Sequence, residues 1–171
     1  MTLKILKHSD LILHTPCQTV DFNDPGFDIE QSLADMSVLM LKNNGLGLAA
    51  NQVGLNKAFF IMRGTEKSIA IFNPRIVALS DDMIDLDEGC LSYPGFFVNI
   101  RRHRHVRLRF ENQFGETTTE LYTGMTARVV QHEIRHLLGE CPFKDVSRLK
   151  IDRALKKSSK QGYQYFHRDF I

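Results

Sequence analysis

The segment that most constrains this chain is MTARVVQHEIRHLL, residues 125–138, which has neither glycine nor proline and is followed by Gly139. A stretch of this length that ends at a glycine is typical of an α-helix. On a helix, His132 and His136 lie about 40° apart around the axis, so both imidazoles can reach one metal ion. Glu133 lies about 100° from His132, where it suits a general base that acts on a water better than a third ligand.

A hydrolytic metal centre also needs a third protein ligand and an open position for water. The candidates downstream of the helix are Glu140, Cys141, Asp145, Asp152 and His167. The better candidate lies upstream, because Cys90 stands between a glycine and a leucine in EGCLSYPG, residues 88–95, and a thiolate binds borderline-soft ions strongly. A lone cysteine is more often a small buried apolar residue, so these residues alone leave the third ligand open.

A third stretch, GLGLAANQVG at residues 45–54, has small residues that make a compact backbone. Within it, Gln52 offers an uncharged NH2 donor. The stretch is either a tight connection between a helix and a strand or a polar group set beside a narrow pocket, where the amide could bind a developing oxyanion.

The length of 171 residues suits one domain over residues 1–171, with a tail from about residue 161 that the pattern does not assign. A net charge of +2 and the lack of a long apolar run do not favour DNA or a membrane as partner. Three cysteines without a CxxC pair argue against a disulfide scaffold. The start, MTLKILKHSDLIL, lacks the features of a secretory signal, which predicts a cytoplasmic protein.

The remaining pattern predicts an α+β fold, with mostly antiparallel strands around the helix that carries the histidines. One further helix is expected at residues 28–44, with Asp28 as N-cap and Gly45 as its end, and a weaker one from about residue 147 to 160. Strands are expected at residues 57–63, 68–72, 106–110 and 117–122, the last two forming a hairpin, and Asn73-Pro74 is expected to break the sheet.

Three of these stretches together resemble the peptide deformylase family: GLGLAANQ (residues 45–52), EGCLS (88–92) and QHEIRHLLG (131–139). Their order and spacing are of the family's kind. Weaker similarities extend over most of the chain, in ILKHSDLIL near the start, IFNP at 71–74 and GMTARVVQHE before the histidines.

The resemblance implies a metal-dependent hydrolase that removes the N-formyl group from the N-terminal methionine of newly made polypeptides and releases formate. Cys90, His132 and His136 would bind one divalent ion, Fe2+ in the cell, with Ni2+, Co2+ or Zn2+ as alternatives. A water activated by the metal would attack the formyl carbon, with Glu133 as general base and then acid. The metal, the side-chain amide of Gln52 and the backbone N–H of Leu91 would stabilise the oxyanion.

The N-formylmethionyl peptide would need an apolar pocket for its methionine side chain. Candidate walls are Leu46, Met125, Val129 and His132, of which the last three share one helical face. Gly47 and Gly89 would let the peptide backbone run close alongside. The family occurs in bacteria, in organelles and in viruses, so a bacterial cell, a phage-infected cell and a mature organellar form all fit this chain.

The chain departs from the family at Arg135, where an aspartate is usual. Arg135 lies about 60° from His132 and about 100° from His136, and its long stem can carry the guanidinium away from the ion. We expect it to pair with an acid outside the ligand set, for which Glu88 and Asp87 in the acidic run before Cys90 are candidates, with a solvent-facing arginine as the alternative. Arg102 matches an arginine that is frequent in the family, so two cations would face each other if it lay beside Arg135.

Two other classes of protein fit part of the sequence. A zincin-like peptidase would use HEIRH with a downstream third ligand and would leave Cys90 and Gln52 without a role. An inactive metal-binding or ribosome-docking relative would have Arg135 as the disabling change. The basic stretch RRHRHVRLR, residues 101–109, is expected to be mainly a solvated strand face, with transient contact to the ribosome as a further role.

Overall fold

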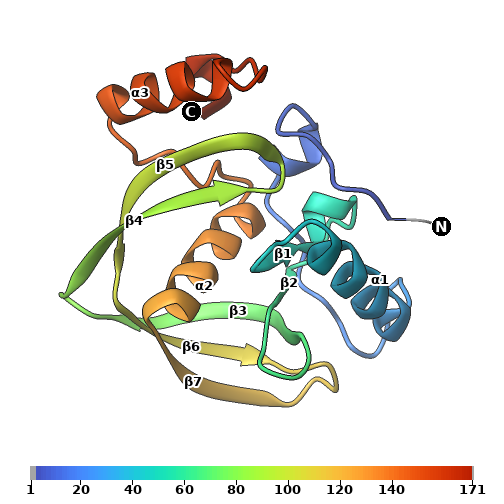
Figure 1. Cartoon of the computed structure of the whole chain (residues 1–171). Helices are drawn as coiled ribbons and strands as arrows, with labels where there is room; N and C mark the ends of the chain where they lie inside the picture. Colours follow the sequence, from blue (N-terminus) through green and yellow to red (C-terminus); the bar gives the residue numbers. More distant parts are fainter. Residues whose placement is uncertain (1–2, 171) are drawn as a thin grey trace.

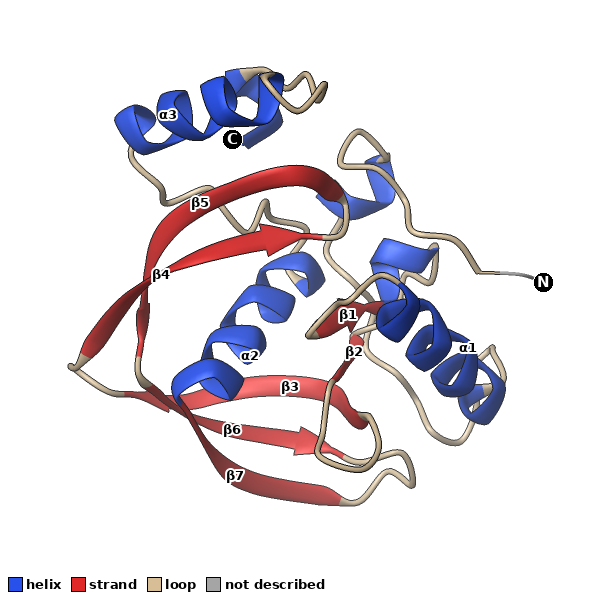
Figure 2. Cartoon of the chain, in the orientation of Figure 1, coloured by secondary structure: helices blue, strands red, loops and turns tan. Residues whose placement is uncertain are grey.

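Helix α2, Gly124–Leu137, lies at the centre of the fold, between a five-stranded sheet and a long two-stranded hairpin (Figure 1). The computed structural model describes residues 3–170. The sheet has the strand order β1-β2-β3-β6-β7, the hairpin pairs β4 with β5, and every pairing of these strands is antiparallel. The predicted α+β class, with antiparallel strands around the histidine-bearing helix, is confirmed (Figure 2).

The other helices are α1 (Ile29–Lys42), α3 (Arg148–Ser159) and the 3-10 turns η1 (Leu11–His14), η2 (Ala50–Val53) and η3 (His167–Phe170). The strands are β1 (Gly47–Ala49), β2 (Phe59–Met62), β3 (Ile69–Leu79), β4 (Met83–Cys90), β5 (Tyr93–His103), β6 (His105–Glu111) and β7 (Thr117–Thr123). Among the residues described, no helix combines the length and the apolar character that crossing a membrane requires.

Strand β2 separates two apolar clusters and is buried on both faces, which explains its unbroken apolar sequence. Phe60 and Met62 pack against the side of α2 that carries Ala127 and Val130. The alternate residues of β2, Phe59 and Ile61, join the cluster under α1, which includes Met36 and Met40. Each cluster therefore fixes one helix on one face of the same sheet.

Helix α1 begins as predicted, because the carboxylate of Asp28 accepts a hydrogen bond from the backbone N–H of Gln31 at 2.9 Å. Its end differs from the prediction. The helix stops at Lys42, and Asn44 takes the left-handed conformation (φ 55°) that was expected at Gly45. Asparagine tolerates this region better than most residues, so Gly45 remains available to the cavity described below.

The predicted break at Asn73-Pro74 is wrong, because β3 continues through it to Leu79. A bulge between Phe72 and Arg75 absorbs the irregular residues. Asn73 takes a positive φ of 47°, and its side-chain amide bonds both the N–H and the carbonyl of Val20, at 2.8 and 2.9 Å. The proline thus marks a bulge and not the end of the strand.

The hairpin of β4 and β5 did not emerge from the sequence pattern, because most β4 side chains are exposed or half-buried and show no alternation. Its far end is held by α3 and the C-terminal segment, which lie beside β5 (Figure 1). An aromatic cluster fills the space between them and includes Tyr93, Phe96, Phe143 and Phe170. This cluster anchors the turn that follows Cys90.

Candidate metal centre

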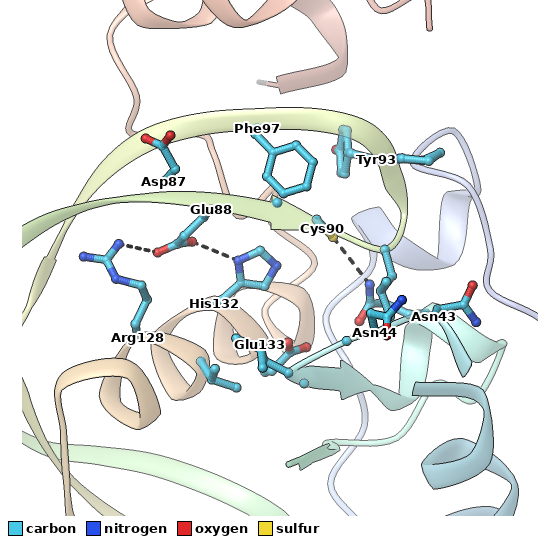
Figure 3. Close-up of a pocket in the computed structure, with 18 of the residues that line it drawn as sticks. Asn43, Asn44, Asp87, Glu88, Cys90, Tyr93, Phe97, Arg128, His132 and Glu133 are labelled. Carbon is cyan, nitrogen blue, oxygen red and sulfur yellow. Dashed lines mark hydrogen bonds and ion pairs between the residues drawn. The ribbon is translucent and has the colours of Figure 1, made fainter. Parts of the chain in front are cut away.

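The two histidines of α2 and the cysteine at the end of β4 come together in one cluster. Figure 3 shows His132 and Cys90 in the space between the helix and the hairpin. The candidate ligand atoms of the cluster all lie within 4.8 Å of one another, and Cys90 Sγ is 3.1 Å from His136 Nε2. Both imidazoles are buried, at 7% exposed for His132 and 1% for His136. Ligand bonds of about 2.0–2.3 Å to a single ion are compatible with separations of this size.

The ring of His132 is oriented by Glu88, whose Oε2 lies 3.0 Å from His132 Nδ1. The same carboxylate accepts two hydrogen bonds from Arg102, each at 2.9 Å, and one from Arg128 at 2.7 Å. Burial alone would raise the pKa of Glu88, but its hydrogen bonds to Arg102 and His132 and the charge of Arg102 outweigh burial and lower this pKa to about 2. Glu88 is therefore a carboxylate that holds the Nδ1–H of His132.

The protonation of the three side chains suits a bound cation. Burial lowers the pKa of both His132 and His136, so both are neutral imidazoles, the form that binds metals. Burial and the nearby Glu133 carboxylate raise the pKa of the Cys90 thiol well above its usual value. The thiol is therefore expected to keep its proton until a cation binds the sulfur and displaces the proton. One sulfur and two imidazole nitrogens fit a divalent transition ion and leave one coordination position open.

Glu133 lies beside these residues and lines the same cavity. Its carboxylate is 4% exposed, and its Oε2 has no hydrogen-bond partner among the residues described. Burial and the negative charge of Glu88 raise the pKa of Glu133 to about 8. A buried carboxylate with a free oxygen and a raised pKa has the properties of a general base.

Gln52 approaches the centre from the turn η2. Its Oε1 accepts a hydrogen bond from the N–H of Ala49 at 2.9 Å, which orients the amide. Its Nε2 donates to Ser92 Oγ at 3.1 Å and lies 3.5 Å from Cys90 Sγ. The NH2 group therefore points to the side of the cavity where Cys90 and Leu91 lie. Ser92 was not singled out in the sequence, although it is the last residue of the EGCLS stretch.

The cavity has a volume of about 520 Å³. All the residues predicted to contact substrate line it: Leu46, Gly47, Gly89, Met125 and Val129. Sequence reasoning missed several other residues of the wall, which include Asn43, Asn44, Tyr93, Phe97 and Arg128. Phe97 pairs with Gly89 across the hairpin, so its position could be inferred only if that hairpin had been predicted.

Arg135 pairs with acids outside the ligand set, as predicted, but the predicted partners Glu88 and Asp87 are wrong. Its guanidinium forms ion pairs with Glu140 and Asp145, which follow the helix in the chain. The reason is geometric: Arg135 points toward the segment after α2, and Glu88 is already occupied.

Arg102 does not lie beside Arg135, so the two cations do not face each other. Arg102 is buried and donates to Glu88 and to the carbonyl of Pro142. Most of the arginines in the stretch 101–109 face solvent as expected, since Arg101, Arg104, Arg107 and Arg109 are exposed. The stretch is not a single strand. It ends β5, turns at Arg104 and begins β6.

The downstream residues considered as third ligands are engaged elsewhere. Glu140 binds Arg135 and Lys144, and His167 binds Asp152. Within residues 3–170, the group that could hold an ion with both histidines includes the upstream cysteine. This geometry does not favour a zincin-like peptidase.

A family model described as polypeptide deformylase matches residues 2–152 of the chain. The chain belongs to the polypeptide deformylase family. Members of this family are metalloenzymes that remove the formyl group from N-formylmethionyl peptides. Its relatives include peptide deformylase 1 of Pseudomonas syringae pv. tomato, 38% identical over 93% of this chain and 95% of that protein, and the peptide deformylase of Pseudomonas aeruginosa, 36% identical over 95% and 97%.

Solved structures of family members have the same fold. A peptide deformylase from Synechococcus elongatus, in complex with actinonin, aligns with a TM-score of 0.87 and 28% identity over 99% of this chain and 90% of that one. The enzyme from Ehrlichia chaffeensis aligns with a TM-score of 0.80 and 33% identity over 95% and 97%. The family similarity thus extends over nearly the whole chain.

Proposed function

We propose that this chain deformylates N-formylmethionyl peptides at the cavity between α2 and the β4–β5 hairpin. The observation that carries the proposal is the position of Glu133, whose partnerless carboxylate oxygen lies at the cavity that Cys90 and His132 line, beside the cluster that these two residues form with His136. A general base beside three metal ligands is the arrangement that metal-assisted hydrolysis requires.

We propose Cys90, His132 and His136 as the ligands of one divalent ion, Fe2+ in the cell, with Ni2+, Co2+ or Zn2+ as replacements. A mixed set of one thiolate and two imidazoles supports a first-row transition ion over Mg2+ or Ca2+, which prefer oxygen ligands. When bound, the ion supplies a lowered pKa for water and charge stabilisation for the formyl oxygen.

The protein's own groups carry the proton transfers. Glu133 accepts a proton from the attacking water and then gives it to the leaving amine. A pKa of Glu133 near neutrality suits both transfers. The Nε2–H of Gln52 and the backbone N–H of Leu91 donate hydrogen bonds to the oxyanion that develops on the formyl group. The hydrogen bond between Gln52 Oε1 and Ala49 supports this role, because it holds the donor in position before the reaction.

The methionine side chain of the substrate is proposed to lie against Leu46, Met125 and Val129. Leu46 and Met125 are 45% and 49% exposed and both line the cavity, so they present apolar surface to a ligand there. Gly47 and Gly89 also line the cavity, and their lack of side chains is proposed to let the peptide backbone run close alongside.

Transient contact with the ribosome and action in the cytoplasm complete the proposal, since the substrate is a newly made chain. Exposed arginines of the stretch 101–109, among them Arg107 and Arg109 on β6, support an electrostatic attraction to ribosomal RNA. Salt-dependent cosedimentation with ribosomes, lost when both are replaced by glutamine, is the expected result.

The proposed function is tested by formate release from formyl-Met-Ala-Ser with protein loaded with Fe2+ or Ni2+. We expect turnover in the wild type and loss of at least about 100-fold in E133A, because general base catalysis contributes about 10²–10⁴-fold. C90S should lose metal as well as activity. Formate release that does not exceed that of E133A would contradict the proposal.

A further inference from the structure

Arg128 lies one helical turn before His132 on α2 and is 4% exposed, so it is a buried cation in the wall of the cavity. Its Nη1 donates to Glu88 Oε1 at 2.7 Å and to the carbonyl of Ile100 at 2.9 Å. Its Nη2 donates to the carbonyl of Ile84. The guanidinium therefore ties α2 to both strands of the hairpin.

Charge neutralisation does not explain Arg128. Arg102 alone forms a bidentate pair with Glu88, through Nε and Nη2 at 2.9 Å each, and this pair is already neutral. A second buried guanidinium adds a positive charge that this pair does not need, and burial of that charge is unfavourable. The carbonyls of Ile84 and Ile100 offset part of this cost but do not require a cation.

The hydrogen bonds that Glu88 accepts indicate a role for Arg128. Oε1 accepts from Arg128 and Arg102, and Oε2 accepts from Arg102 and from His132 Nδ1. Donors from both α2 and β5 thus fix the rotation of the carboxylate. A fixed carboxylate sets both the tautomer and the orientation of the imidazole, whose opposite edge faces Cys90 (Figure 3).

We propose that Arg128 is a positioning residue for the metal centre, which acts through Glu88 on the ring of His132. This inference rests on the proposed metal-binding role of His132. Because Arg128 also binds Ile84, it fixes the distance between α2 and β4, the two elements that carry His132 and Cys90. Arg128 therefore fixes both the orientation of the His132 ring and the spacing between His132 and Cys90.

The test measures Co2+ binding separately from activity. The wild type and the variants R128M, R128K, E88Q and R128M/E88Q are titrated with Co2+ against a competing chelator, and the absorption spectrum of the bound Co2+ reports its ligand geometry. R128K keeps the charge but replaces the forked donors by one ammonium group. If R128M does not fold, R128K takes its place in the titration. R153M removes an exposed arginine of α3 and controls for the lost charge.

We expect R128M to weaken Co2+ binding about 10- to 100-fold and to shift the ligand-field bands, with R128K between R128M and the wild type. R153M should bind as the wild type does. On the E88Q background, R128M should cause a smaller loss than on the wild-type background, because only the contacts of Arg128 with Ile84 and Ile100 remain to be removed. The inference is overturned if R128M or R128K binds Co2+ with unchanged affinity and spectrum, or if R128M causes the same loss on both backgrounds.

The outcome is distinguishable from failure of the proposed function. Wild-type protein that binds Co2+ but releases no formate would remove the deformylase proposal and leave the role of Arg128 standing. Wild-type protein that does not bind Co2+ would overturn both.

Discussion

Replacement of Gly47 by alanine provides a direct test of the position of Glu133. A Cβ atom at Gly47 would lie 2.5 Å from Glu133 Oε1, 2.9 Å from Glu133 Cδ and 2.8 Å from Val129 Cγ1. Ordinary contacts begin at 3.4 Å, so the carboxylate oxygen must move by about 1 Å. Gly47 is not in the left-handed region, so alanine adds no backbone strain.

The carboxylate and not the backbone is expected to move, because the side chain can rotate and no residue in the range 3–170 hydrogen-bonds to Oε2 of Glu133. Displacement of a catalytic group by about 1 Å can reduce the rate about 100-fold, which is about 2.7 kcal/mol in the barrier. The free energy of unfolding should fall by only about 1–3 kcal/mol, as is typical of overpacking. We therefore expect G47A to remain folded and to lose about 100-fold in kcat/KM.

The assay is formate release by metal-loaded G47A, with E133D and G47A/E133D as partners in a double-mutant cycle. Aspartate is one methylene shorter and leaves room for the new methyl group, so G47A should cost little on the E133D background. Retention of kcat/KM within about twofold in G47A, or an equal loss on both backgrounds, would refute the proposed position of the base.

Three further predictions concern stability. D28A removes the N-cap of α1 and should lower the free energy of unfolding by about 1 kcal/mol in urea denaturation, whereas D28N should retain most of it. F170A empties part of the aromatic cluster beside β5 and should cost about 3 kcal/mol, seen as a lower urea midpoint; an unchanged midpoint would show that the C-terminal segment is not docked. Lys144 and Arg135 lower the pKa of Glu140 in the folded state. The ion pairs therefore stabilise the fold above the unfolded-state pKa, and this contribution is lost as the pH falls through the folded-state pKa; E140Q should be less stable than the wild type by under about 1 kcal/mol near pH 7 and equal to it near pH 3.

Local patterns in the sequence determined the elements whose side chains show a clear periodicity or a terminal signal. The alternation of Val106, Leu108 and Phe110 predicted β6, because one face of that strand is buried. The carboxylate of Asp28 predicted the start of α1. The family motifs predicted the fold class and the candidate ligands. The pair His132 and His136 was also predicted from spacing, because this spacing has one natural geometry on a helix.

The β4–β5 hairpin and the partners of the charged residues depended on tertiary structure. The hairpin has no strong pattern of its own, since its strand β4 faces solvent and is held by α2 and the aromatic cluster. Glu88 and Asp87 were the expected partners of Arg135 because an acidic run directly precedes Cys90 in the sequence. Whether two charges meet depends on which groups already surround each of them, and a sequence does not contain that information.

The sequence by itself therefore determined the chemistry of this protein: which groups can bind a metal, accept a proton or donate to an oxyanion. The tertiary structure decided how these groups are supported. No sequence motif pointed to Arg128, whereas the fold places its guanidinium against both strands of the β4–β5 hairpin and beside Glu88. The physical reason is that a side chain's chemistry is local, whereas its burial and its partners depend on elements distant in the chain.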